Sequence, residues 1–149
     1  SKIKKIFDEL KTPFIINQPS YSMLNRWIEE DGLKDYAYEN GLGLAVFSPL
    51  AQGLLTDKYL KTNTGSSNRP WMKSQPDENT LKKLKKLNEI AANRGQKLSQ
   101  MALSWVLRDD KITTVLIGAS RPEQITENLQ AVFKTDFSQE ELMAIEDTL

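Results

Sequence analysis

The chain has 149 residues, 20 basic and 20 acidic side chains, and neither cysteine nor histidine. The balanced charge gives no support for a nucleic-acid or anionic-membrane partner, and the lack of cysteine excludes a disulfide framework, thiolate catalysis and cysteine-bound metals. The lack of histidine removes the commonest general acid–base and the commonest metal ligand, so any chemistry must use carboxylates, lysine, tyrosine or a bound cofactor.

The first half of the chain predicts two helices and two short strands. Apolar residues at helical spacing predict a helix over 3–10, and an apolar run over 14–18 predicts a strand. A second helix is predicted over 32–40 and a second strand over 42–48. A proline follows each strand, and proline ends backbone pairing because it has no N–H to donate.

The second half is predominantly helical. The composition of 62–77 shifts to asparagine, glycine, serine, proline and lysine, which predicts a long loop. Helices are predicted over 80–94 and 99–108, and a third strand over 113–117. The lysine-rich outer face of the first of these helices is interpreted as a solvated surface.

Two capping boxes predict where the last two helices begin. Ser120 and Glu123 have the spacing in which each side chain bonds the other residue's backbone N–H, and Pro122 suits a first helical turn. Ser138 and Glu141 repeat this spacing and predict the start of the terminal helix.

The alternation of strands and helices predicts an α/β fold with parallel strands and right-handed crossovers. All three strands are apolar runs without polar alternation, which is typical of strands buried on both faces. Each strand ends in polar residues: Asn17 and Gln18 end the first, Ser48 ends the second, and Ser120 comes after the short turn that follows the third. Because ligands bind at this edge in parallel α/β folds, we expect a binding site there.

The segment 117–129 is the most informative part of the sequence. The chain leaves an apolar strand, turns at Gly118 and enters a helix, whose free N–H groups and positive dipole end suit a phosphate. Arg121 adds a fixed positive charge at the same point. One face of this helix is polar and could reach the rest of a nucleotide; it consists of Gln124, Glu127 and Asn128. An ordinary capped surface helix has the same pattern, and both interpretations stay open.

Three segments in this order and spacing resemble the last three βα units of an aldo-keto reductase. They are 17–22, 47–55 and 118–128, and the chain is most similar to the bacterial branch related to potassium-channel β-subunits. The resemblance covers nearly the whole chain and implies the C-terminal portion of a TIM (β/α)8 barrel. It would contribute strands six to eight with their crossover helices, one extra helix and a C-terminal helix. Residues 1–149 would then be a single partial barrel domain whose N-terminal half is absent.

The resemblance implies a nicotinamide site and a pyrophosphate site. Gln18 matches the glutamine that bonds the nicotinamide carboxamide, and Phe47 matches the aromatic residue on which the nicotinamide ring stacks. The residues that match the pyrophosphate cradle are Ser48, Pro49, Leu50 and Gly53, with Lys58 and Arg69 folding over it.

The resemblance also implies NADP rather than NAD as the cofactor. Ser120, Arg121 and Gln124 match the site of the adenosine 2′-phosphate, and Gly118 provides the turn before it. Glu127 and Asn128 match the pair that holds the adenine edge.

The implied function is reduction of an aldehyde or ketone by hydride transfer from NADPH. The partner would be a small carbonyl substrate, with no nucleic acid, membrane or metal, and formation of a homo-oligomer is left open. The family's catalytic tyrosine, aspartate, lysine and histidine lie in the first half of the barrel, so no catalytic residue is assigned and this chain alone is expected to be inactive.

Two alternatives remain. One is a non-catalytic NADP-binding regulatory module like a channel β-subunit, and the other is an inactive truncated fragment. The cytoplasm is the expected location, because the sequence has no signal-peptide pattern and no apolar run of transmembrane length.

Overall fold

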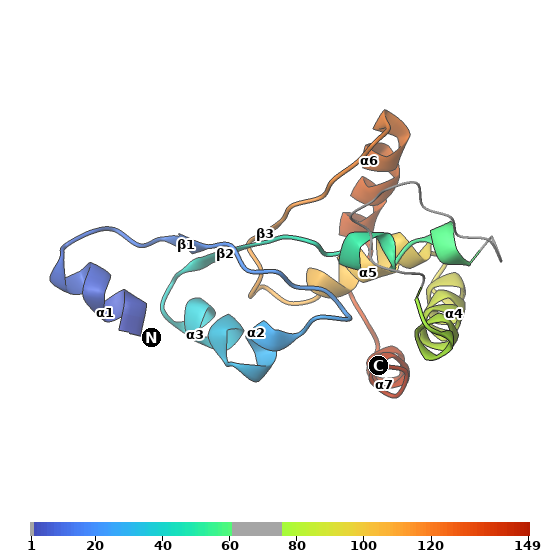
Figure 1. Ribbon diagram of the computed structural model, residues 1–149, viewed down its shortest axis with the longest axis horizontal. Coiled ribbons are helices and arrows are strands. Elements are labelled where there is room, and N and C mark those ends of the chain that lie inside the picture. Colours follow the sequence, from blue (N-terminus) through green and yellow to red (C-terminus); the bar gives the residue numbers. More distant parts are fainter. Residues whose placement is uncertain (1, 61–75) are drawn as a thin grey trace.

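A computed structural model describes residues 2–60 and 76–149 and gives an elongated α/β molecule (Figure 1). The elements in chain order are α1 (Lys2–Glu9), β1 (Ile16–Asn17), α2 (Trp27–Glu30), α3 (Leu33–Glu39), β2 (Gly43–Val46), η1 (Ala51–Gly53), η2 (Asp57–Tyr59), α4 (Glu78–Asn93), α5 (Leu98–Val106), β3 (Thr114–Val115), α6 (Pro122–Leu129), η3 (Gln130–Phe133) and α7 (Gln139–Glu146), where η marks a 3₁₀ helix. Each predicted helix and strand is present, although the strands are shorter than expected. The short helix α2 was not predicted, and most of the predicted loop 62–77 lies outside the described residues.

The three strands form one parallel sheet in the order β1-β2-β3, as predicted. Ile16 pairs with Gly43 between β1 and β2, and Val46 pairs with Val115 between β2 and β3. The connections that return the chain to the sheet contain α2 and α3 in the first crossover and α4 and α5 in the second. The parallel arrangement places the carboxyl ends of all three strands at one edge.

Only the central strand is mostly buried, so the expectation of burial on both faces is wrong for the outer strands. Leu44 and Val46 of β2 have no exposed surface. By contrast, Ile16 of β1 is 50% exposed and Leu116, directly after β3, is 44% exposed. The reason is geometric: the helices cover one face of this three-stranded sheet, while the other face and the outer strands lack equivalent neighbours among the described residues.

The core lies on the helix-covered side of the sheet and includes buried residues of α2, α3, α4, α5 and α7. Leu84, Leu87 and Ala91 of α4 point inward, as their spacing predicted. Helix α5 is buried at every position except Gln100 and contributes Trp105, the largest fully buried side chain among the described residues. These two helices pack against each other, and α4 also contacts α7.

Arg94 attaches the C-terminal segment to the end of α4. Its guanidinium carbon lies 3.7 Å from the centre of the Phe137 ring, and Nη2 donates to the carbonyl oxygens of Lys134 and Asp136 at 3.2 and 2.9 Å. It also forms an ion pair with Glu141. The predicted capping box at α7 is confirmed, because the hydroxyl of Ser138 accepts from the Glu141 backbone N–H at 3.2 Å and the Glu141 carboxylate accepts from the Ser138 N–H at 2.8 Å.

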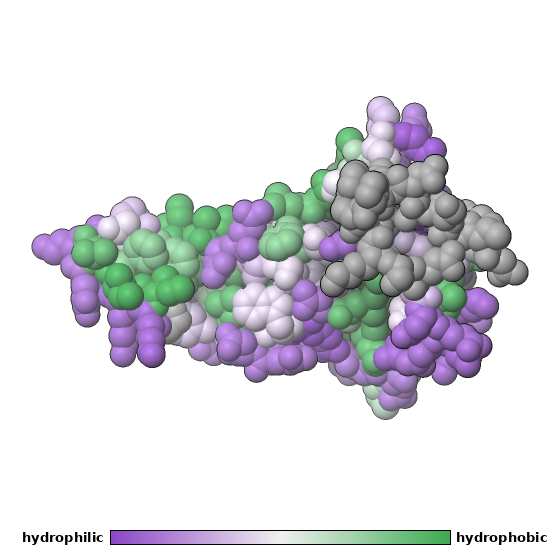
Figure 2. Space-filling view, viewed as in Figure 1, coloured by the Kyte–Doolittle hydropathy of each residue, from purple (hydrophilic) through white to green (hydrophobic). Residues whose placement is uncertain are grey.

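The N-terminal end of the molecule is apolar and exposed. Helix α1 projects from the sheet and has no buried residue (Figure 1). Its contact with the following chain is a stack of Phe7 on Phe14, with 5.1 Å between ring centres. Apolar side chains gather at this end of the surface (Figure 2); the exposed ones are Ile3, Ile6, Leu10, Ile15 and Ile16. In the part of the chain that the structure describes, no helix is long and apolar enough to cross a bilayer.

Candidate functional site

The strand register brings Gln18 and Phe47 to the same face of the sheet. The pairing of β1 with β2 continues past the strand ends, where Ser20 bridges Phe47. The Phe47 N–H donates to the Pro19 carbonyl at 3.0 Å, and the Tyr21 N–H donates to the Phe47 carbonyl at 3.1 Å. Since side chains alternate along a strand and paired residues share a face, Gln18, Ser20 and Phe47 lie on one side.

This face of the sheet is accessible. The ring of Phe47 is 41% exposed, and Gln18 is also exposed. The opposite face carries Leu44 and Val46 and packs on the helices. An exposed aromatic ring with an exposed amide side chain beside it can stack on a flat heterocycle and bond its polar edge.

The loop after β2 has an unusual backbone. Four of its residues have a positive φ, namely Ser48 (56°), Ala51 (47°), Gln52 (57°) and Gly53 (93°). Outside glycine, each such residue costs about 1 kcal/mol or more, and such strain is concentrated at functional sites. Pro49 is buried and Leu50 packs on the core, so the loop is anchored while Ser48 faces outward.

Of the two basic residues predicted to fold over the pyrophosphate, the structure describes only Lys58. Lys58 is exposed in η2, and its ammonium lies 5.4 Å from the centre of the Tyr59 ring. The η2 turn begins at Thr56, whose hydroxyl accepts from the Lys58 backbone N–H at 3.4 Å. Arg69 lies outside the described residues.

Helix α6 begins differently from the prediction. Its N-cap is Arg121, and Pro122 occupies the first helical position. The side-chain oxygen of Gln124 accepts from the backbone N–H groups of Ser120 and Arg121, at 2.8 and 3.3 Å, and from the Ser120 hydroxyl at 3.1 Å. The predicted capping box of Ser120 with Glu123 is therefore wrong. With Pro122 in the first helical position, the start of α6 is capped by the Gln124 amide oxygen alone, because the N-cap Arg121 has no side-chain acceptor for a backbone N–H.

The polar face of α6 packs on the protein and its apolar face is exposed. Glu127 forms an ion pair with Lys97, and its carbonyl oxygen accepts from Gln100 Nε2 at 3.0 Å. Asn128 is only 8% exposed, whereas Ile125 and Leu129 are exposed. The two residues predicted to hold an adenine edge are thus already engaged with α5 or largely buried.

The structure brings two of the three predicted segments together and separates the third. After β3 the chain runs outward through the exposed Gly118 to the start of α6, which then returns toward α5 (Figure 1). Arg121 is exposed at the N-terminus of α6, and this helix end lies away from the three strands (Figure 1). This separation between the sheet edge and the start of α6 suits an extended ligand that has an anionic group at one end.

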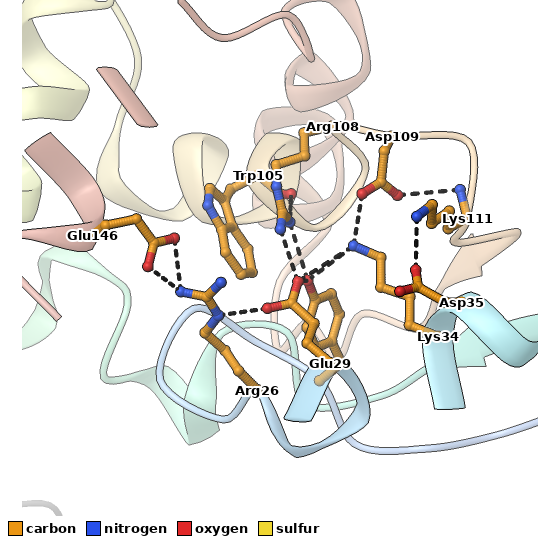
Figure 3. Close-up of polar contacts among 10 residues, drawn as sticks. Arg26, Glu29, Lys34, Asp35, Trp105, Arg108, Asp109, Lys111 and Glu146 are labelled. Atoms are coloured by element: carbon orange, nitrogen blue, oxygen red, sulfur yellow. Dashed lines mark hydrogen bonds and ion pairs between the residues drawn. The ribbon is translucent and has the colours of Figure 1, made fainter. Parts of the chain in front are cut away.

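A cluster of charged residues lies on the helix side of the sheet, and the sequence reasoning missed it. Its centre is the Tyr21 phenol, which has no exposed surface and donates to Glu29 Oε1 at 2.5 Å. Figure 3 shows the cations Arg26, Lys34 and Arg108 arranged around the Glu29 carboxylate. Arg108 donates to both groups, at 3.0 Å to the phenol oxygen and 2.8 Å to Oε1. The remaining charged members of this ionic cluster are Arg26, Lys34, Asp109 and Glu146.

The ionic cluster shifts the pKa values of its central groups in opposite directions. Burial raises the pKa of the Tyr21 phenol well above its ordinary value. Burial by itself would also raise the pKa of Glu29, but hydrogen bonds from Tyr21, Arg108 and Arg26 outweigh it and hold this pKa at about 2. A buried phenol that stays protonated and a carboxylate that is ionised at neutral pH indicate a structural role.

Two contacts of the ionic cluster join residues that are close in the sequence, and helical spacing could have predicted them. Arg26, the N-cap of α2, bonds Glu29 three residues later at 2.6 Å. Trp105 and Arg108 are also three residues apart, and the guanidinium carbon lies 3.7 Å from the ring centre. The contacts that join Tyr21 to Arg108 and Arg26 to Glu146 span 87 and 120 residues. No local sequence pattern encodes such long-range pairs.

The described residues fit a nicotinamide dinucleotide at three points. An exposed ring is available to the nicotinamide at Phe47, a strained loop with an outward serine follows β2, and an exposed arginine begins α6. The adenine end fits less well, because Glu127 is paired with Lys97 and Asn128 is largely buried.

Comparison with known proteins gives a consistent result. Residues 1–149 match the sequence model of the Aldo/keto reductase family. The chain is 46% identical to L-glyceraldehyde 3-phosphate reductase of Escherichia coli (strain K12), over 97% of this chain and 44% of that protein. It is 34% identical to a probable voltage-gated potassium channel subunit beta of Oryza sativa subsp. japonica, over 79% of this chain and 38% of that protein.

Solved structures agree with the sequence matches. A glycerol dehydrogenase from Gluconobacter oxydans superposes with a TM-score of 0.79 at 27% identity, over 99% of this chain and 46% of that one. An aldo-keto reductase from Bacillus halodurans superposes with a TM-score of 0.68 at 28% identity, over 98% of this chain and 46% of that one. The chain thus spans less than half the length of the relatives that it matches.

Proposed function

Because this chain belongs to the aldo/keto reductase family, we propose that it supplies most of the cofactor site of an NADPH-dependent reductase of small aldehydes or ketones. The observation that carries the proposal is the pair Gln18 and Phe47, which share an exposed face at the carboxyl edge of a parallel sheet. Ligand sites of parallel α/β folds lie at this edge.

We infer that β1, β2 and β3 are strands six to eight of a (β/α)8 barrel and that residues 1–149 form one C-terminal part of it. The parallel order and the paired crossover helices support this assignment. The exposed Ile16 and Leu116 support it as well, because the interior and flanking strands of a barrel would cover them.

NADPH, when bound, supplies the hydride. Phe47 presents a ring face for the nicotinamide, and the amide of Gln18 would bond its carboxamide and decide which ring face meets the substrate. The strained loop from Ser48 to Gly53 would hold the pyrophosphate, with Lys58 and Arg69 as its cations. The charge of Arg121 at the start of α6 would hold the 2′-phosphate, with Gly118, Ser120 and Gln124 shaping the turn and Glu127 and Asn128 bordering the adenine.

We propose a short polar aldehyde as the substrate. The support is the 46% identity to a protein named for its reduction of L-glyceraldehyde 3-phosphate. We expect the protein to act in the cytoplasm.

A non-catalytic NADP-binding regulatory module is the second candidate, and the matches to potassium-channel β-subunits favour it. NADPH oxidation by the complete protein, with glyceraldehyde 3-phosphate and with 4-nitrobenzaldehyde, separates the two. Turnover supports the reductase, and NADPH binding without turnover supports the regulatory module. Failure to bind NADPH would contradict both.

A further inference from the structure

The hydroxyl group of Ser20 has a defined direction. Its oxygen accepts from Asn25 Nδ2 at 3.0 Å and from the indole N–H of Trp27 at 3.3 Å. A hydroxyl oxygen has two lone pairs and one hydrogen, so these two donors direct its hydrogen away from both side chains. Among the residues that the structure describes, the Ser20 hydroxyl accepts these two hydrogen bonds and donates none.

The two donors are themselves held in place. The indole N–H of Trp27 also donates to the Ser20 carbonyl at 2.9 Å, which fixes the ring against the end of β1. Ser22 and Asn25 exchange two backbone hydrogen bonds of 3.1 Å, and this closed turn holds Asn25 beside Ser20. Because the donors cannot easily move, the direction of the hydroxyl hydrogen is set before any ligand arrives.

Ser20 lies in the proposed reductase site. It bridges Phe47 across the sheet and shares a face with Gln18, two residues earlier. At about 3.3 Å per residue, Ser20 lies roughly 7 Å nearer the open carboxyl edge than Gln18. Trp27 is 40% exposed next to it and provides an immobilised apolar surface.

We propose that Ser20 is a substrate-binding residue, whose hydroxyl donates to an oxygen of the small polar aldehyde while Trp27 packs against its carbon chain. The inference rests on the proposed function. Asn25 is a positioning residue, since it acts through the Ser20 hydroxyl. The assignment to substrate follows from position, because Gln18 lies deeper and is assigned to the nicotinamide.

The test compares variants of the complete protein in NADPH-dependent reduction of glyceraldehyde 3-phosphate. Ser20→Ala should raise KM about tenfold and leave kcat within about twofold, because one hydrogen bond to the substrate is lost. Ser20→Thr keeps the hydroxyl and should restore KM to within about twofold. The matched control is Ser22→Ala, because Ser22 is buried two residues away and its hydroxyl has no partner among the described residues.

Trp27→Phe keeps an aromatic ring and removes the N–H, so it should raise KM by a smaller factor, about threefold. The N–H of Trp27 acts through the Ser20 hydroxyl. The double variant that combines Ser20→Ala with Trp27→Phe should therefore have a KM no higher than about twice that of Ser20→Ala alone. NADPH affinity, measured by fluorescence titration, should stay within about twofold in all variants.

The outcomes separate the two proposals. An unchanged KM in Ser20→Ala, while the unaltered protein is active, contradicts the inference alone. A loss of NADPH affinity equal to the rise in KM would assign Ser20 to the cofactor and also contradict it. Absence of aldehyde reduction by the unaltered protein overturns the proposed function and this inference with it.

Discussion

The Tyr21 phenol donates a 2.5 Å hydrogen bond to Glu29 Oε1 and so joins the segment after β1 to helix α2. Arg108 and Lys34 reach the same carboxylate oxygen, at 2.8 and 3.3 Å, from the end of α5 and from α3. One carboxylate thus connects four segments behind the sheet. The cluster holds the chain from Tyr21 backward to Ser20 and Gln18, which lie on the opposite face at the proposed site.

Replacing Glu29 should therefore destabilise the fold. In Glu29→Gln the cations Arg26, Lys34 and Arg108 keep their charges and lose a shared partner, and breaking a buried ion pair in this way costs about 3 kcal/mol. Urea unfolding of the complete protein measures this loss. Glu30→Gln is the matched control, because Glu30 is exposed on the same helix and should change stability by less than about 0.5 kcal/mol. Equal effects of the two substitutions would contradict the structural role.

Acid should weaken the fold through the same carboxylate. Its pKa in the folded protein is about 2, below the ordinary value of 4.5, so the folded state favours the ionised form. The resulting stability is fully present above about pH 5 and is lost as the pH falls toward about 2. Thermal unfolding across this range should show a steeper decline for the unaltered protein than for Glu29→Gln. Parallel declines would remove Glu29 as the cause.

Cofactor choice should depend on Arg121. Arg121→Ala should weaken NADPH binding about 10- to 100-fold and NADH binding by less than about threefold, because only NADPH carries the additional phosphate. Titration of both cofactors measures the difference. Lys82→Ala on the exposed face of α4 removes an equal charge elsewhere and should affect neither. A similar loss for both cofactors in Arg121→Ala would rule out the 2′-phosphate assignment.

Gln18 and Phe47 should matter for turnover more than for binding of the adenosine end. Gln18→Ala and Phe47→Ala should each lower kcat at least about tenfold, because hydride transfer is sensitive to small displacements of the ring. Affinity for adenosine 2′,5′-bisphosphate, which lacks the nicotinamide, should stay within about twofold. If bisphosphate affinity falls as much as turnover, both positions are structural.

The isolated 149-residue chain should self-associate and show no turnover. Its exposed apolar residues on α1 and β1, including Ile6 and Ile16, favour association in water. Sedimentation should detect species larger than a monomer, and Ile6→Lys should reduce them. No NADPH oxidation with 4-nitrobenzaldehyde is expected, because the chain has no histidine to complete the family's catalytic group. Turnover by the purified chain would assign the acid to one of its own tyrosines.

Local sequence signals were enough to predict most elements. Helical spacing located α1, α4 and α5, and the Ser138 capping box located the start of α7. Capping boxes and apolar spacing are short-range patterns, and so they are readable from neighbouring residues alone. At α6 such a pattern misled, because the Gln124 amide oxygen, and not Glu123, accepts from the backbone N–H groups of Ser120 and Arg121 at the start of the helix.

The sequence by itself determined the parallel α/β order, the family resemblance and the polar residues at the strand ends. The tertiary structure decided what depends on distant partners: the register that aligns Ser20 with Phe47, the exposure of the outer strands, and the turn of α6 that packs its polar face on α5. The tertiary structure also decided which residues form the ionic cluster. Arg26 and Glu146 are 120 residues apart in the sequence, and they meet only because α2 and α7 pack on the same core. The physical reason is that burial and charge pairing depend on separation in space, which a local pattern does not specify.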